Sequence, residues 1–436
     1  MVTITINNSL SQITGLTPAD EKKLKAELSY VVGGSSSYYS GYGPRKKSLL
    51  DKRGYFPTGL LPRVKRYLSS WSIGMAVIEK RKRPGIGNPF DFKHKDGYKP
   101  HDEQLSAMFG ALSNHRGIIS SPTGTGKSFI IALIASRLGL RTLVVVPSLE
   151  IKKQLVEDLG SALMATGLVV VENIDSTRLG KLTDFDVLII DEAHHVAAKT
   201  YHKLNMKAWT GIYYRFFLTA TPFRNDTEEQ LLFEAIADRV IYQLTFQQAV
   251  AAKMIVPVEA YYIDIPKQST DAHTWQQVYN ELVVNNDIRN EIIALTLVRL
   301  HSIGVSTLCL VREVKHGQIL SDLTGIPFVH GSDDDSRDYI RQFKNGTLKA
   351  LIGTEGVIGE GVDTKPCEYV IIAGLGKAKS AFMQKVGRTV RNYLKKDSGK
   401  VIIFRDTSHK FTLRHFNAQK KIIQDEYKTI TMKLEI

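Results

Sequence analysis

Residues 117–139, GIISSPTGTGKSFIIALIASRLG, give the clearest indication of the fold class. It begins with a short β-branched apolar run, continues through a Gly-rich segment, and ends with apolar side chains at helical spacing. This order predicts a strand, a phosphate-binding loop and a helix. Such a succession is the first part of a parallel α/β unit, because the helix returns the chain for the next parallel strand.

The loop at residues 121–128, SPTGTGKS, fits the pattern G-x-x-x-x-G-K-S/T, with a small Ser in place of the first Gly. Gly residues let backbone N–H groups approach phosphates, and the helix N-terminus adds its positive dipole end. Lys127 is suited to the β- and γ-phosphates, and the Ser128 hydroxyl to Mg²⁺. A chance GKS in a turn is the alternative, which the strand and helix around it disfavour. The predicted ATP-binding residues here are Ser121, Pro122, Thr123, Gly124, Thr125, Gly126, Lys127 and Ser128.

A second stretch, DVLIIDEAHH at residues 186–195, carries two carboxylates after an apolar strand. Asp191 is placed to hold Mg²⁺ through water, and Glu192 to polarise an attacking water, as in-line phosphoryl transfer requires. His194 completes the predicted catalytic group at this strand end. The position of this carboxylate pair supports the prediction, because the chain between the phosphate loop and the pair is long enough for two strands.

Charge is concentrated at the beginning of the chain. The 436 residues carry a net charge of +14, and residues 1–99 hold 18 Lys and Arg against seven Asp and Glu. Tyr side chains are interleaved with these cations, which favours a polyanion-binding module over a merely solvated face. The apolar fraction of 43% excludes a mainly disordered chain, and the longest apolar runs are too short to cross a bilayer.

Cysteine usage and the start of the chain bear on the compartment. Two cysteines, Cys309 and Cys367, allow neither a disulfide framework nor a four-ligand zinc site, so no structural metal is expected. The first residues lack the features of a secretory signal. A reducing, cytoplasmic location and no membrane partner are therefore expected.

Two sets of short apolar strands predict two consecutive parallel α/β units, the first of which contains the loop. A less regular connection is expected over about residues 240–288, and an amphipathic helix and tail that pack on the second unit are expected at the C-terminal end. The N-terminal segment reads as a small α/β domain that includes a helix with Leu60, Val64 and Leu68 on one face. The predicted domains are residues 1–98, 99–245 and 246–436.

In this order, the loop, the DEAH tetrapeptide and LTATP at residues 218–222 resemble a superfamily 2 helicase or translocase. The resemblance implies two tandem RecA-like domains that use ATP and Mg²⁺. It implies an adenine contact for Gln104, nucleic-acid phosphate contacts for Pro147 and Ser148 in PSLEIKKQ, and a coupling role for Thr219 and Thr221.

The second unit carries the remaining motifs of the resemblance. GTEGVIGEGVD at residues 353–363 implies a nucleic-acid phosphate contact for Thr354 and nucleotide contacts for Gly361 and Asp363. QKVGRTVR at residues 384–391 fits the pattern Q-x-x-G-R-x-x-R and implies catalytic roles for Gln384, Arg388 and Arg391. The two arginines would act as fingers that reach across a cleft to the γ-phosphate.

The segment GYFPTGLLPRVKRYL, residues 54–68, is similar to phage UvsW-type helicases and more distantly to XPB-like enzymes. This likeness implies sequence-independent binding of branched or duplex DNA, with Arg63, Lys65 and Arg66 in contact with it. It implies remodelling of forks or Holliday junctions in replication, recombination or repair, in a bacterial host cytoplasm and alongside other such proteins. An RNA-dependent ATPase, a duplex translocase that does not separate strands and an ATP-gated clamp are the alternatives.

Overall fold

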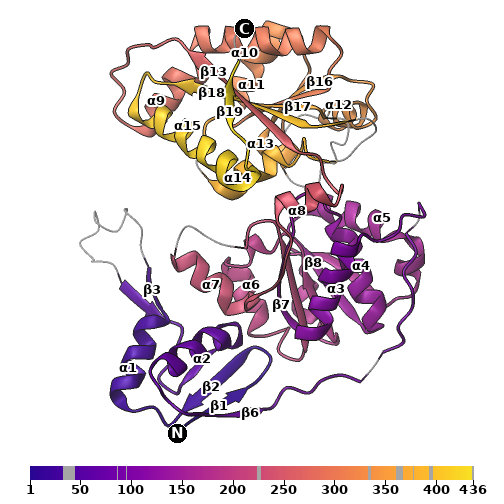
Figure 1. Cartoon of the computed structure of the whole chain (residues 1–436), viewed down its shortest axis with the longest axis vertical. Coiled ribbons are helices and arrows are strands. Elements are labelled where there is room, and N and C mark those ends of the chain that lie inside the picture. The colour runs from indigo at the N-terminus through magenta and orange to yellow at the C-terminus, as the bar shows by residue number, and fades with distance from the viewer. Residues whose placement is uncertain are drawn as a thin grey trace. The chain divides into compact units, whose positions relative to one another are not determined.

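The computed structural model describes residues 1–32, 45–85, 87–94, 96–222, 227–331, 335–359, 367–376, 378–391 and 396–434. The chain forms two compact units (Figure 1). The first comprises Met1–Ser121 and Gly126–Gln243, and the second comprises Pro122–Thr125 and Leu244–Ile436. The predicted domain boundaries at residues 98 and 245 stay predictions. Gly361 and Asp363, which are predicted to contact the nucleotide, lie outside the described residues.

The N-terminal module, residues 1–80, is a small α/β fold built on a four-stranded sheet in the order β5-β2-β1-β6. Strand β1 pairs antiparallel with β2 and parallel with β6, and a separate ribbon joins β3 and β4. Val64 and Leu68 of α2 and Leu60 of the short 3-10 helix before it are fully buried, which confirms the predicted apolar face. The elements are β1 (Val2–Ile6), β2 (Leu10–Thr14), α1 (Pro18–Glu27), β3 (Ser29–Val32), β4 (Arg45–Ser48), β5 (Tyr55–Pro57), α2 (Leu61–Ser70) and β6 (Met75–Glu79).

The rest of the first unit is a six-stranded parallel sheet in the order β12-β7-β11-β10-β8-β9. Its central strands are buried along their whole length, because helices cover both faces, and consist mainly of aliphatic and aromatic residues, with Arg116 in β7 and Arg215 in β11 as exceptions. The elements are α3 (Asp102–Asn114), β7 (Arg116–Ser120), α4 (Lys127–Leu138), β8 (Thr142–Val146), α5 (Leu149–Ala165), β9 (Val169–Asn173), β10 (Val187–Ile190), α6 (Lys199–Asn205), β11 (Tyr214–Thr219), α7 (Thr227–Ala237) and β12 (Val240–Gln243).

The second unit holds a seven-stranded parallel sheet in the order β15-β16-β14-β17-β18-β13-β19. The two parallel sheets confirm the predicted α/β class with two RecA-like domains. The elements are α8 (Phe246–Ala251), β13 (Val258–Ile265), α9 (Trp275–Tyr279), α10 (Asp287–Ser302), β14 (Thr307–Val311), α11 (Val314–Thr324), β15 (Phe328–Val329), α12 (Ser336–Lys344), β16 (Ala350–Thr354), α13 (Glu355–Gly359), β17 (Tyr369–Ile372), α14 (Lys379–Val386), β18 (Gly399–Asp406), α15 (Lys410–Ile422) and β19 (Thr431–Lys433).

The irregular connection predicted over residues 240–288 is wrong. This stretch supplies strand β12 to the first sheet and the eight-residue strand β13 to the second, where β13 lies between β18 and β19. Strand β13, with the sequence VEAYYIDI, alternates buried and partly exposed side chains because it lies near the edge of its sheet. The C-terminal tail also joins this sheet, since β19 pairs with β13. Among the described residues, no helix is both long enough and apolar enough to span a bilayer.

His316 on α11 makes the second unit sensitive to acid. Its Nε2 lies 3.0 Å from Asn290 Oδ1 on α10, and burial lowers the pKa of His316 to about 3. The pKa of His316 is lower in the folded state than the unfolded value of 6.5. The contribution of the neutral His316 to the free energy of unfolding should therefore be complete above pH 6.5 and be lost as the pH falls toward 3. We expect His316→Gln to remove about 1.3 kcal/mol from the difference in the free energy of unfolding between pH 7.0 and pH 5.5, measured by urea unfolding. Equal slopes in the variant and the wild type would contradict this prediction, and the exposed His301→Gln on α10 is the control.

Candidate nucleotide site and nucleic-acid interface

The carboxyl ends of four parallel strands gather the predicted nucleotide-site residues of the first unit at one edge of its sheet. Strands β8, β10, β11 and β7 are neighbours in that order, and their registers align these ends. In open α/β sheets this edge is where ligands bind. The predicted residues that end or follow these strands are Pro147 and Ser148, Asp191 and Glu192, Thr219 and Thr221, and Ser121 and Lys127.

The backbone of the phosphate loop has the conformation that its glycines permit. Gly124 and Gly126 have φ of 88° and 74°, in the left-handed region, and Lys127 is the first residue of α4. Ser121, the residue that replaces the first Gly of the pattern, is fully buried, and its N–H donates to the Thr219 carbonyl oxygen at 3.0 Å. The Ser therefore fits, and it ties the loop directly to the LTATP segment.

Gln104 lies against the phosphate loop from the neighbouring helix α3. A side chain at Gly126 would come within 2.6 Å of Gln104 Nε2, so the absence of a Cβ there lets the amide approach. Gln104 is 5% exposed, and its Oε1 accepts the His101 N–H at 3.0 Å. The structure thus places the predicted adenine-reading amide beside the loop, with its orientation fixed by the start of its own helix.

The DEAH residues form a charged cluster with the loop lysine. Lys127 Nζ lies 3.8 Å from Glu192 Oε1, and His194 Nδ1 lies 3.3 Å from Glu192 Oε2. The Glu192 N–H donates to Asp191 Oδ1 at 2.9 Å. Burial and the neighbouring Glu192 carboxylate raise the pKa of Asp191, against the opposing attraction of Lys127. The structure therefore brings together four residues that were predicted to be catalytic from two separate motifs.

The charge balance of this edge suits a divalent cation that arrives with a nucleotide. A buried carboxylate whose pKa is raised by a second carboxylate gains from a cation that neutralises both. Magnesium commonly uses one or two carboxylates plus substrate phosphates. Asp191 and the Ser128 hydroxyl are the groups that would hold Mg²⁺, and the cation would supply charge neutralisation at the phosphates.

The predicted coupling residue Thr219 and the predicted phosphate contact Ser148 each have a local hydrogen-bond partner. Thr219 is fully buried, and its Oγ1 accepts the Thr221 N–H at 3.1 Å. Ser148, which follows Pro147, caps α5 by accepting the Ile151 N–H at 3.2 Å. A hydroxyl that accepts a bond keeps its own proton to donate, so the Ser148 cap is compatible with a bond to a phosphate oxygen.

In the second unit, Thr354 ends strand β16 and is 8% exposed, while Gln384 lies on α14. Arg388 is buried, and Arg391 forms an isolated antiparallel bridge with Ile255. Sequence reasoning missed an ion pair between these two motifs. Lys385 Nζ lies 2.5 Å from Glu355 Oε1, and both residues adjoin predicted site residues. The spacing of residues in the sequence does not predict this ion pair, because its two partners lie in segments that only the fold brings together.

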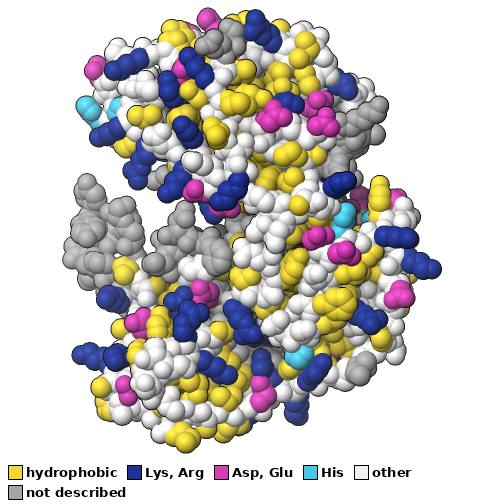
Figure 2. Space-filling view, in the orientation of Figure 1, with side chains coloured by type: hydrophobic (Ala, Val, Ile, Leu, Met, Phe, Trp, Pro, Cys, Tyr) yellow, Lys and Arg dark blue, Asp and Glu magenta, His cyan; other side chains and the backbone are white. Residues whose placement is uncertain are grey.

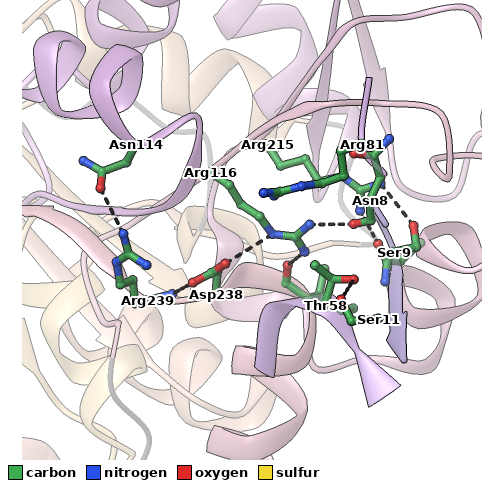
Figure 3. Close-up of polar contacts among 12 residues, drawn as sticks. Asn8, Ser9, Ser11, Thr58, Arg81, Asn114, Arg116, Arg215, Asp238 and Arg239 are labelled. Carbon is green, nitrogen blue, oxygen red and sulfur yellow. Dashed lines mark hydrogen bonds and ion pairs between the residues drawn. The ribbon is translucent and has the colours of Figure 1, made fainter. Parts of the chain in front are cut away.

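The N-terminal module is docked on the first RecA-like sheet through a buried polar network (Figure 3). Arg116, at the start of β7, donates to the Asn8 carbonyl oxygen at 2.6 Å and lies 3.5 Å from Asp238. Arg215, on β11, is fully buried and donates to Ser9 Oγ at 3.1 Å. Each of these hydrogen bonds therefore joins a donor in the sheet to an acceptor in the module.

An apolar core supports the same docking, because Leu231 and Ala235 of α7 are buried within the core of the module. Arg63, whose contact with DNA stays a prediction, has its Nη2 2.7 Å from Glu234 Oε2 on α7. Arg66 is exposed and Lys65 is partly exposed. Figure 2 shows Lys and Arg side chains spread over the visible face of the N-terminal module among apolar ones. The structure thus gives Arg63 a docking partner and leaves Lys65 and Arg66 accessible.

Two family models match the chain. "Type III restriction enzyme, res subunit" matches residues 97–181 and 170–224, and "Helicase conserved C-terminal domain" matches residues 289–393. DNA 3'-5' translocase XPB2 of Sulfurisphaera tokodaii is 25% identical over 71% of the chain and 82% of its own length. ATP-dependent DNA helicase uvsW of Enterobacteria phage T4 is 20% identical over 79% of the chain and 78% of its own length. The chain spans 48% to 64% of three further curated relatives.

A solved structure shares the fold. The fragment of a putative HsdR subunit of a type I restriction enzyme from Vibrio vulnificus matches with a TM-score of 0.59 and 17% identity. The match covers 91% of the chain and 76% of the fragment. At this identity the likeness concerns the fold alone.

Proposed function

We propose that this chain, a superfamily 2 helicase that resembles UvsW and XPB, uses ATP to move along DNA and to remodel branched DNA. The chain is a nucleic-acid-dependent ATPase of the helicase class. The observation that supports the finer proposal is the docking of a basic module on the unit that holds Lys127 and Glu192. DNA held by that module would be carried with the motor.

In the proposed reaction, Glu192 orients a water and accepts its proton while the water attacks the γ-phosphorus of ATP. The bond from the γ-phosphorus to the bridging oxygen breaks, and ADP and phosphate leave. Lys127 neutralises the charge on the transferred group, and Arg388 and Arg391 are assigned to the same phosphate. Loss of the γ-phosphate releases these arginines, which lets the two units change their grip on the strand.

We assign to the LTATP segment the coupling between the nucleotide site and the bound nucleic-acid strand. Ser121 of the loop is bonded to Thr219, so a shift of the loop on hydrolysis reaches this segment directly. Thr354 and Ser148 would grip backbone phosphates alternately through hydroxyl groups. Contacts of this kind do not read sequence.

A duplex DNA translocase that does not separate strands is the second candidate. It is favoured by the likeness to a relative named a translocase, which the chain matches over most of that protein's length. An RNA-dependent ATPase is a further alternative, since no assigned residue reads a 2′-hydroxyl.

One experiment separates these candidates. ATPase stimulation and strand separation are measured with the full chain on forks, four-way junctions, single-stranded DNA, blunt duplex DNA and RNA duplexes. Branch remodelling predicts the strongest stimulation and product formation on forks and junctions. Stimulation by blunt duplex without strand separation would favour the translocase, and stimulation by RNA alone would overturn the DNA assignment.

Removing the two accessible cations of α2 should weaken DNA binding and its salt dependence. Each phosphate contact contributes a slope of about 0.9 to the plot of log affinity against log salt, so Lys65→Ala/Arg66→Ala should lower the slope by about 1.8. The measurement is fork binding by fluorescence anisotropy from 50 to 200 mM salt. The exposed pair Lys420→Ala/Lys421→Ala on α15 is the control, and an unchanged slope in the α2 variant would exclude these contacts.

We extend the proposal to a bacterial host cytoplasm and to other replication or recombination proteins as partners. Its support is the UvsW resemblance of the sequence. Capture of tagged full-length chain from infected or expressing cells, with fractionation, would test both points.

A further inference from the structure

The second unit contains a pocket of about 450 Å³ outside the predicted nucleotide-site residues. Its walls come from α9 and α15 and from the segments that follow β14, β16 and β17. This volume lies within the range of about 300–1,000 Å³ that is typical of small-molecule sites. The whole pocket belongs to one unit, so its shape is set by a single fold.

Aromatic side chains form one wall of this pocket. Trp275 of α9 stacks on His415 of α15, with ring centroids 4.1 Å apart and an interplanar angle of 20°. Phe411 meets Trp275 edge to face at 6.2 Å. Trp275 is only half-buried, whereas His415 behind it is buried. A partly open indole held rigid by a stacked partner is a platform on which a planar ring can stack.

Charged side chains form another part of the pocket wall. Arg312, Arg414 and Lys385 line it together with the carboxylate Glu355. Lys385 is already paired with Glu355 at 2.5 Å, so the two exposed arginines carry the net positive charge. Within the described part of the chain, neither arginine forms an ion pair with an acidic side chain. Uncompensated guanidinium groups beside an aromatic platform suit a ligand that has both a planar ring and a phosphate.

The pocket adjoins the predicted strand contact of the second unit. Strands β14 and β16 pair so that Val311 lies opposite Thr354, and Arg312 and Glu355 are the next residues of each strand end. The Tyr279 hydroxyl behind this edge is buried and has no hydrogen-bond partner among the described residues. A backbone phosphate at Thr354 would therefore place its own base or a neighbouring base next to the pocket.

We infer that this pocket takes an unstacked base of the bound nucleic-acid strand, with Trp275 as the stacking platform and Arg312 and Arg414 on the flanking phosphates. The inference rests on the proposed function, because it names a contact of the same bound strand. It assigns sequence-tolerant recognition to the second unit, since every base offers a π-face. A base held here resists sliding of the strand, which phosphate contacts alone do not prevent.

The test is a thermodynamic cycle on the full-length chain with two probes, a labelled oligothymidine and an oligonucleotide of the same length with abasic sites. Trp275→Leu should weaken binding of oligothymidine about 5- to 100-fold, as loss of base–aromatic stacking does. The same variant should bind the abasic strand as the wild type does. Trp275→Phe, which keeps an aromatic ring, should retain most of the affinity for oligothymidine.

Two further variants make the outcome specific. Trp71→Leu removes a half-buried tryptophan of the N-terminal module, which stacks on Tyr67, and should not distinguish the two strands. Arg414→Ala should lower the salt slope for single strands by about 0.7, whereas Trp275→Leu should leave that slope unchanged. Equal loss on both strands, or no loss with Trp275→Leu, overturns the pocket assignment. If the wild type binds neither strand nor a fork, the proposed function itself fails.

Discussion

Glu192→Gln is expected to lower the nucleic-acid-stimulated ATPase rate by about 100- to 10,000-fold while nucleotide binding persists. The amide has nearly the same shape as the carboxylate but cannot accept the proton of the attacking water. The Lys127 contact at 3.8 Å also weakens, which affects the apo state more than the nucleotide complex. The measurements are steady-state phosphate release with saturating fork DNA and equilibrium binding of a fluorescent ATP analogue.

Lys127→Ala provides the contrast, because it removes the cation that holds the phosphates. We expect this variant to lose both nucleotide affinity and turnover, whereas Glu192→Gln should lose turnover alone. Glu291→Gln makes the same chemical change at an exposed position of α10 and is the matched control. Full turnover in both active-site variants would show that the nucleotide site has been assigned wrongly.

The edge of the first sheet could be predicted from sequence because each of its parts is local. A phosphate loop needs Gly at left-handed positions and a helix directly after it, and Gly124, Gly126 and Lys127 meet these needs within a few residues. Asp191 and Glu192 follow an apolar strand, and parallel strands end at a common edge. Local pattern and sheet geometry together therefore predict that Lys127 and Glu192 meet.

The docking of the N-terminal module could not be predicted in this way. It depends on Arg116 and Arg215, which stand in strands that otherwise read as continuous apolar runs. Their partners lie far away in the sequence, for example the Asn8 carbonyl and Ser9 hydroxyl. A backbone carbonyl as a partner leaves no trace in side-chain identity, so the sequence gives no sign of this partner. Arginines inside predicted buried strands were the available signal.

Strand β13 and the pocket on α9 show a second limit. The alternation in VEAYYIDI is a strand signal, but residues 240–288 lack the dense apolar runs that marked the other strands. Trp275 and His415 come from α9 and α15, which are far apart in the sequence. Their stacking depends on the helices that the fold places together, so sequence patterns predict neither the platform nor its cations.

The largest effect on stability is expected from a substitution in the buried polar network that docks the N-terminal module on the first sheet. Arg116 is 5% exposed, Asp238 is 9% exposed, and burial lowers the pKa of Arg116 to about 10 and raises that of Asp238. Both groups are costly to bury, so each depends on the other. Arg116→Met should lower the free energy of unfolding of the first unit by about 3–5 kcal/mol, because it leaves the Asp238 carboxylate buried without its cation.

The variant also strips donors from the Asn8 and Ile236 carbonyl oxygens, which Arg116 holds at 2.6 and 2.9 Å. The exposed neighbour Arg239→Met is the matched control and should change stability by no more than about 0.5 kcal/mol. Asp238→Asn in the Arg116→Met background should restore part of the loss, since the unpaired carboxylate charge is then removed, and Asn tolerates the positive φ of 75° at this position.

Two tryptophans allow the docking to be followed separately from folding. Trp71 reports on the N-terminal module and Trp209 on the core of the first RecA-like sheet. In single-tryptophan versions of the chain, urea unfolding should give coincident transitions, because the module and the sheet share Leu231 and Ala235 in one core. Arg116→Met should shift both transitions together. A Trp71 transition that moves alone would show that the module folds independently and that its DNA grip is not fixed to the motor.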